Sequence, residues 1–143
     1  MNAIWDFIAM NWKGILAATV AAMIIGSLWY SKMVFGKQWQ KLVGLKDSEM
    51  KTGMAKAMII MLAMALVTAY VLARFVAIAN PQTYMQALKL GFWIWLGFVA
   101  TYAIVGRLFE KRPARLIALN IGNQLLTLLV MSAIIFVRRY ALL

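Results

Sequence analysis

The chain has 143 residues, of which 65% are hydrophobic and only 13% are charged. An ordinary soluble domain carries about 25% charged residues, so too few polar side chains remain here to cover a surface that faces water. The chain has no cysteine and no histidine, which excludes disulfides, thiol chemistry and imidazole-ligated haem or zinc. In a membrane protein the formal net charge of +11 favours contact with anionic lipids, and we expect no nucleic-acid partner.

Four stretches of the sequence lack any charged residue and are long enough to cross a bilayer. They cover residues 14–31, 57–73, 90–106 and 116–137. A helix needs roughly 17 to 25 apolar residues to cross about 30 Å of hydrocarbon. The sequence therefore predicts an all-α integral membrane protein with a single domain over residues 1–143. Its four transmembrane helices are expected at about residues 12–31, 54–79, 87–109 and 114–138.

The connection after the first helix begins with aromatic side chains and lysines. Rings with a polar edge are most stable at the level of the lipid headgroups, where lysine ammonium groups reach the phosphates. Farther along, apolar residues recur with helical spacing at Phe35, Trp39, Leu42 and Val43. This pattern predicts a short amphipathic helix over about residues 34–45 that lies in the membrane interface. The expected interfacial anchors are Trp29, Tyr30, Trp39, Lys37 and Lys41.

Small residues recur at every fourth position in three of the predicted helices. The first helix has Gly14, Ala18, Ala22 and Gly26, the second has Ala65, Ala69, Ala73 and Ala77, and the fourth has Ala114, Ala118 and Gly122. Because lipid tails are as apolar as leucine, helices in a membrane associate through close backbone approach. The pattern favours a tightly packed bundle, with one set of small residues available for self-association. The alternative is that alanine and glycine are simply common in membrane helices.

The fourth helix carries polar residues on one face, because Asn120, Asn123, Gln124 and Thr127 are spaced three or four positions apart. An unpaired amide in hydrocarbon costs several kcal/mol, so this face is expected to point inward. Equal counting from the turn at residues 111–112 places two residues of the third helix at the same depth. The predicted polar intramembrane cluster is therefore Thr101, Tyr102, Asn120, Asn123, Gln124 and Thr127. Such a cluster either forms hydrogen bonds between helices or lines a neutral binding pocket or a pore constriction.

The lysines and arginines are unevenly distributed between the connections. Six lysines fall in residues 31–56 and four cations in residues 107–115, out of fifteen in the chain. The positive-inside rule then makes these two connections cytoplasmic and places both termini outside. The second group, Arg107, Lys111, Arg112 and Arg115, is a candidate site for a lipid headgroup or another anion. The alternative is that these residues only set the orientation.

Several segments resemble a bacterial family called domain of unknown function seventeen sixty-one. The resemblance is carried first by GSLWYS, FGKQW, KLVGL and GMAKA, and later by LGFWIWLGFVAT and LFEKRPARL. It is collinear and covers about residues 10 to 137. The resemblance implies a small four-helix protein of the bacterial inner membrane, and it implies no particular activity.

No constellation of residues in the sequence indicates catalysis. A serine triad lacks its usual base, no glycine-rich phosphate loop occurs, and none of the four acidic residues lies within a predicted span. We therefore expect no enzyme activity, no cofactor and no metal site. The sequence favours a structural or interaction subunit that packs with itself or with a larger membrane complex and binds membrane lipids. The alternative is a passive channel or transporter for a small solute, lined by the amide face of the fourth helix.

Overall fold

The computed structural model describes residues 3–140, and over that range the chain forms helices and no strands. Four helical segments are long and apolar enough to cross a membrane, which confirms the predicted all-α fold with four candidate spans. They are α1 (Ala3–Trp29), α4 (Met54–Ala79), a composite segment from Tyr84 to Glu110, and α7 (Ala114–Tyr140). The composite segment consists of α5 (Tyr84–Ile94), the π-helix η1 (Trp95–Ala100) and α6 (Thr101–Glu110).

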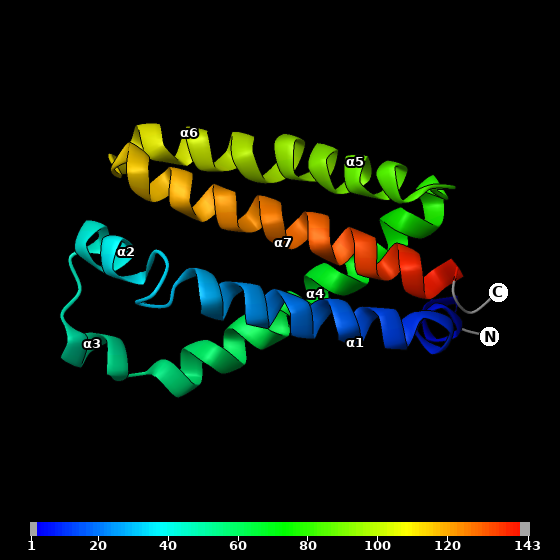
Figure 1. Ribbon diagram of the computed structural model, residues 1–143, viewed down its shortest axis with the longest axis horizontal. Coiled ribbons are helices and arrows are strands. Elements are labelled where there is room, and N and C mark those ends of the chain that lie inside the picture. Colours follow the sequence, from blue (N-terminus) through cyan, green and yellow to red (C-terminus); the bar gives the residue numbers. More distant parts are fainter. Residues whose placement is uncertain (1–2, 141–143) are drawn as a thin grey trace.

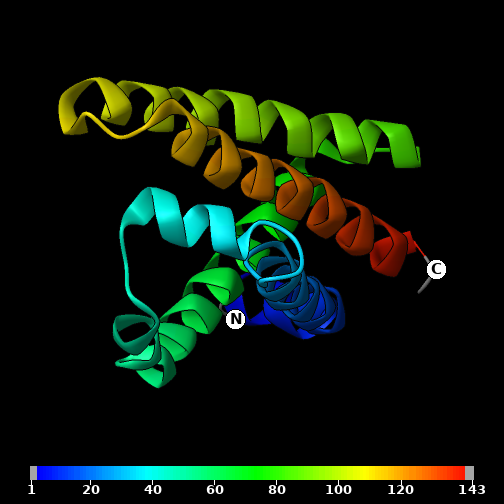
Figure 2. The same cartoon turned by 60° about the vertical axis from the view of Figure 1, so that its left-hand side comes forward.

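The four spans run back and forth along the long axis of the molecule (Figure 1). The turn between α6 and α7 lies at the same end as α2 (Gly36–Val43) and α3 (Asp47–Lys51). The connection between α4 and α5 lies at the other end, together with both ends of the described chain. Helix α7 runs between α5 and α1 and packs most extensively against these two helices (Figure 2).

Two helices extend beyond their predicted starts. Helix α1 begins at Ala3 rather than near residue 12, and α5 begins at Tyr84 rather than near residue 87. A charge-free window marks only the part of a helix that suits hydrocarbon, whereas a helix of 27 residues is about 40 Å long and reaches past it. At the start of α5, the Thr83 hydroxyl accepts a hydrogen bond from the backbone N–H of Gln86 at 3.2 Å, which caps the helix.

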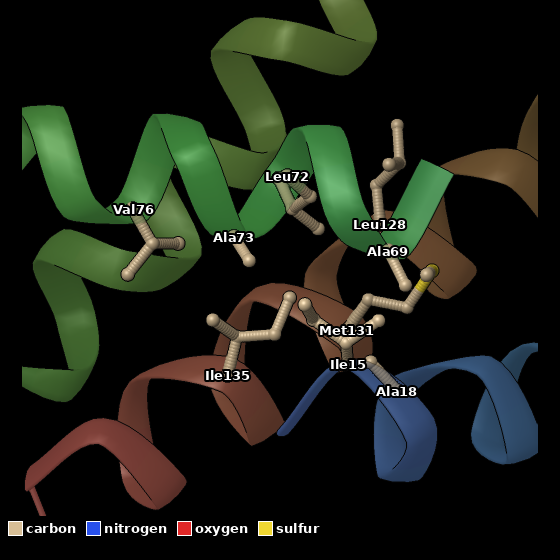
Figure 3. Close-up of a cluster of buried hydrophobic side chains, with 9 residues drawn as sticks. All are labelled: Ile15, Ala18, Ala69, Leu72, Ala73, Val76, Leu128, Met131 and Ile135. Carbon is tan, nitrogen blue, oxygen red and sulfur yellow. The ribbon is translucent and has the colours of Figure 1, made fainter. Parts of the chain in front are cut away.

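The apolar core lies where α1, α4 and α7 meet (Figure 3). Ala18 of α1, Ala69 of α4 and Met131 of α7 are completely inaccessible to solvent. The sets of small residues on α1 and α4 thus supply core positions, as close backbone approach requires. On α7, by contrast, Ala114 and Ala118 are exposed, and the core is filled by larger side chains of that helix.

Helices α5 and α7 approach each other closely at Gly91. A Cβ atom added there would lie 2.6 Å from Ser132 Oγ and 2.9 Å from the Leu128 carbonyl oxygen. No side chain fits at such distances, so glycine is required for this approach. The π-helix η1 follows only a few residues later in the same span.

The connection between α1 and α4 folds into the two short helices α2 and α3. Helix α2 has eight residues, is shorter than the expected 34–45, and packs against α7. The side-chain amide N–H of Gln40 donates to Asp47 Oδ1 at 2.8 Å, and Lys32 Nζ lies 3.9 Å from the same oxygen atom. First the Gln40 hydrogen bond and then the Lys32 charge lower the pKa of the Asp47 carboxyl. That α2 lies in a membrane interface stays a prediction.

The core packing predicts a specific sensitivity to side-chain size. Ala69→Leu adds three carbon atoms where α4 meets its neighbours, so it should lower the free energy of unfolding by about 1–3 kcal/mol. Ala63→Leu is the matched control, because Ala63 lies on the same helix and is exposed. The measurement is thermal or denaturant unfolding in mild detergent. Equal stability of the two variants would contradict the packing described here.

Candidate functional site

The polar face of α7 points partly into the bundle and partly away from it. Asn123 is 6% exposed and Thr127 is 8% exposed, so both are buried among the helices. Asn120 is half-buried and Gln124 is exposed. Two of the four polar residues on this face therefore lie in the interior, one lies at its edge and one faces outward.

Asn120 is hydrogen-bonded to a residue ninety positions away. The Tyr30 hydroxyl donates to Asn120 Oδ1 at 2.9 Å and so ties the segment that follows α1 to the first half of α7. The sequence pattern had indicated Asn120 and Asn123 as neighbours, but it had placed Tyr30 among the lipid anchors.

The aromatic side chains around Tyr30 pack against one another. The ring centroids of Trp29 and Phe35 lie 4.7 Å apart, and those of Tyr30 and Trp39 lie 5.6 Å apart in a T-shaped arrangement, with the edge of one ring toward the face of the other. A Cβ atom added to Gly122 of α7 would lie 3.4 Å from the Trp29 ring. Of the predicted anchors, the three aromatic residues are thus half-buried against the protein, whereas Lys37 and Lys41 are exposed.

Two polar atoms in this region are buried without a hydrogen-bond partner in residues 3–140. They are Trp29 Nε1 and Asn123 Oδ1. Trp95 is differently placed: its indole N–H donates to the Ile121 carbonyl oxygen of α7 at 2.8 Å. The patterns in the sequence did not indicate Trp95 as a site residue. The available signal was its type, because a buried tryptophan usually finds an acceptor for its N–H group.

Three members of the predicted polar cluster lie outside the interior of the bundle. Gln124 is exposed, Tyr102 is 81% exposed, and the exposed Thr101 hydroxyl donates to the Gly97 carbonyl of its own span at 2.8 Å. Thr101 and Gln124 therefore lie outside the predicted cluster, whereas Tyr102 lines an open recess together with Asn120 and is not buried beside Asn123. Counting residues from the α6–α7 connection gives only the depth of a side chain along the helix axis. The π-helix η1 just before Thr101 adds one residue to a helical turn, which rotates the side chains that follow by about 100° about that axis.

An open recess lies between α6 and α7 at the end of the molecule that carries their turn. Its volume is about 290 Å³. Its lining consists of Tyr102, Ala103, Gly106, Arg107 and Glu110 from α6, Arg112 from the turn, and Ile117 and Asn120 from α7. Arg112 pairs with Glu110, while Arg107 forms no ion pair with any residue from 3 to 140. The recess therefore brings together two cations of the predicted anion site, Arg107 and Arg112. It also contains two residues of the predicted polar cluster, Tyr102 and Asn120.

The other two cations of the predicted anion site lie outside the lining of this recess. Lys111 ends α6 in a left-handed conformation with φ of 53°, and Arg115 is exposed in the first turn of α7. Within residues 3–140, no group of three Asp or Glu side chains is arranged to hold a metal ion. The chemistry that the recess offers is therefore hydrogen-bond donation and positive charge.

Four helices long and apolar enough to cross a bilayer define the chain as a small multi-pass α-helical membrane protein. The chain belongs to the family described as "Protein of unknown function (DUF1761)", whose pattern matches residues 14–136. The match confirms the family resemblance that the sequence motifs had indicated. No curated protein and no solved structure matches the chain.

The hydrogen bond between Tyr30 and Asn120 predicts a measurable contribution to stability. Tyr30→Phe removes only the hydroxyl, so it should lower the free energy of unfolding by about 0.5–1.5 kcal/mol. Tyr84→Phe is the matched control, because Tyr84 is exposed and lies in the first turn of α5. Both variants are compared with wild type by thermal unfolding in the same detergent. A Tyr30 variant as stable as the control would show that the contact contributes nothing.

Proposed function

We propose that this protein is a structural or interaction subunit of a bacterial inner membrane, without enzymatic activity of its own. It packs with a second copy or with a larger membrane complex, and its cationic end associates with anionic lipids. The observation that carries the proposal is the burial of Asn123 and Thr127, which are 6% and 8% exposed. A solute path requires polar residues in contact with water, whereas these two residues are packed between helices.

The exposure of α4 indicates which surface would contact a partner. Every residue from 54 to 64 is exposed, so the first half of this span has little contact with the other helices in a single chain. In Figure 1 this half of α4 also diverges from α1 toward α3. A helix that makes so few contacts gains stability from a neighbouring protein, because close packing drives association in lipid.

The orientation follows from charge. The two connections with many cations lie at the same end of the molecule: one contains α2 and α3, and the other is the α6–α7 turn (Figure 1). Ten of the fifteen lysines and arginines belong to these connections. We place this end in the cytoplasm and both termini outside, because positively charged short loops are retained on the cytoplasmic side. Each cation near the surface adds about 1 kcal/mol of attraction to an anionic leaflet.

The orientation is tested with single cysteines, since the natural chain contains none. Ser48→Cys in α3 should be protected from a membrane-impermeant thiol reagent in intact cells, and Gln82→Cys between α4 and α5 should react. Both positions are exposed, so access to the reagent depends only on the side of the membrane. Permeabilised cells provide the control, in which both cysteines should react. The opposite labelling pattern in intact cells would reverse the orientation.

The role as a subunit predicts a particle larger than one chain and no transport. In native-lipid nanodiscs the mass should exceed that of the 16.1 kDa chain by at least one further protein chain. Liposomes containing the purified protein should release small neutral solutes no faster than protein-free liposomes. A single chain that releases solute, and that releases less after Asn123→Leu, would contradict the proposal and support the passive channel, because a hydrophobic constriction can close a pore by dewetting.

A further inference from the structure

We infer that the recess between α6 and α7 binds the phosphate and glycerol region of one anionic phospholipid. The inference rests on the lipid association proposed above, and it goes beyond that proposal by replacing general attraction with a defined site. Arg107 provides the charge, Asn120 and Tyr102 provide hydrogen-bond donors, and Gly106 leaves the space between them. Three features of the recess support binding of this group: its charge, the depth of its lining residues and its free space.

The first feature is the charge at the mouth of the recess. Arg107 and Arg112 both contribute to its lining, and the only acid there, Glu110, is paired with Arg112. Arg107 has no acidic partner among residues 3–140. A guanidinium group offers a planar set of donors that matches a phosphate, so the unpaired Arg107 is suited to bind one. Cationic pockets between membrane helices are known to bind phospholipid headgroups on this principle.

The second feature is the depth of the lining residues in the membrane. The span from Tyr84 to Glu110 has 27 residues, so it is about 40 Å long and extends roughly 5 Å beyond the hydrocarbon at each end. Arg107 lies about 4.5 Å from its end and therefore at the boundary with the headgroups. Asn120 and Tyr102 lie about 9 and 12 Å from the ends of their helices, just inside the hydrocarbon.

The donors at that depth have no partner within the described chain. Asn120 uses its Oδ1 to accept from Tyr30, while its amide Nδ2 makes no hydrogen bond with residues 3–140. The hydroxyl of Tyr102 also lacks a protein partner, although this side chain is 81% exposed toward the membrane. In a phospholipid the ester carbonyls lie directly below the phosphate and accept hydrogen bonds. The vertical order of phosphate and carbonyls thus matches the order of Arg107 above Asn120 and Tyr102.

The third feature is the free space. No residue of α6 is buried, and a Cβ atom added to Gly106 would have no neighbour within 4 Å. The volume of about 290 Å³ is at the lower limit of typical ligand sites. This volume suits a phosphate and glycerol group rather than a whole lipid, whose chains would continue along the exposed apolar surface of α6.

The test is native mass spectrometry of the full chain in mild detergent, titrated with phosphatidylglycerol and, separately, with phosphatidylcholine. Wild type should retain one phosphatidylglycerol per chain in preference to phosphatidylcholine. Arg107→Gln should weaken this retention about tenfold, because it removes the charge-assisted hydrogen bonds. Lys41→Gln is the matched control: it removes the same charge from an exposed lysine of α2, outside the recess, and should bind like wild type.

A second variant tests the recess without changing charge. Gly106→Leu fills the space between α6 and α7 and should abolish the stoichiometric lipid, while thermal unfolding stays close to wild type because the site is open. If this variant does not fold, the comparison of Arg107→Gln with Lys41→Gln decides the matter. Inorganic phosphate and sn-glycerol phosphate form a further arm. Equal occupancy by these soluble anions would overturn the assignment to a lipid.

The outcomes separate this inference from the proposed function. If Arg107→Gln and Lys41→Gln lose phosphatidylglycerol equally, or if neither Arg107→Gln nor Gly106→Leu loses any, the recess is not the site. Lipid association through the cationic end as a whole would then remain. If wild type retains phosphatidylglycerol and phosphatidylcholine alike, the association with anionic lipids proposed above is wrong as well.

Discussion

Close packing against α7 is the constraint on which the rest of the described chain depends. In lipid, apolar burial gives no net attraction between helices, so the helices must come close enough to gain dispersion contacts. Helix α7 meets this requirement on several sides, with Met131 and Ser132 fully buried and Gly91 of α5 almost touching its backbone. The first half of α4 lies outside this arrangement and is exposed, and it is the surface that we propose another protein covers.

The same packing connects the fold to the recess. The segment after α1 folds onto α7, where the Tyr30 hydroxyl occupies the acceptor of Asn120. The amide nitrogen of Asn120 is thereby left as a donor on the lining of the recess. A contact that stabilises the bundle also orients a side chain at the site, so substitutions at Tyr30 affect both properties. Arg107 and Gly106 are the cleaner probes of the site, since they take no part in the core.

Charge and apolarity act on different properties of this protein. The apolar spans provide solubility in the bilayer, and the cations at one end are the basis of the orientation and of the affinity for anionic lipid that we propose. Neither property requires a chemical step. The polar residues inside the bundle are amides and hydroxyls, which donate and accept hydrogen bonds but do not change charge near neutral pH. This combination fits a subunit that organises lipid or protein neighbours.

The amino-acid sequence by itself determined the all-helical class and the four spans, because hydrocarbon thickness and the cost of buried charge act on each segment separately. It also indicated that Asn123 and Thr127 point inward, since helical spacing places them on one face. Only the tertiary structure decided which polar groups meet. Tyr30 lies ninety residues from Asn120, and Thr101 and Tyr102, which follow the π-helix η1, are exposed rather than packed beside the buried Asn123. The physical reason is that a pairing between helices depends on the rotation of each helix about its axis and on the close approach of its neighbours, and neither quantity is encoded in the spacing of residues along one segment.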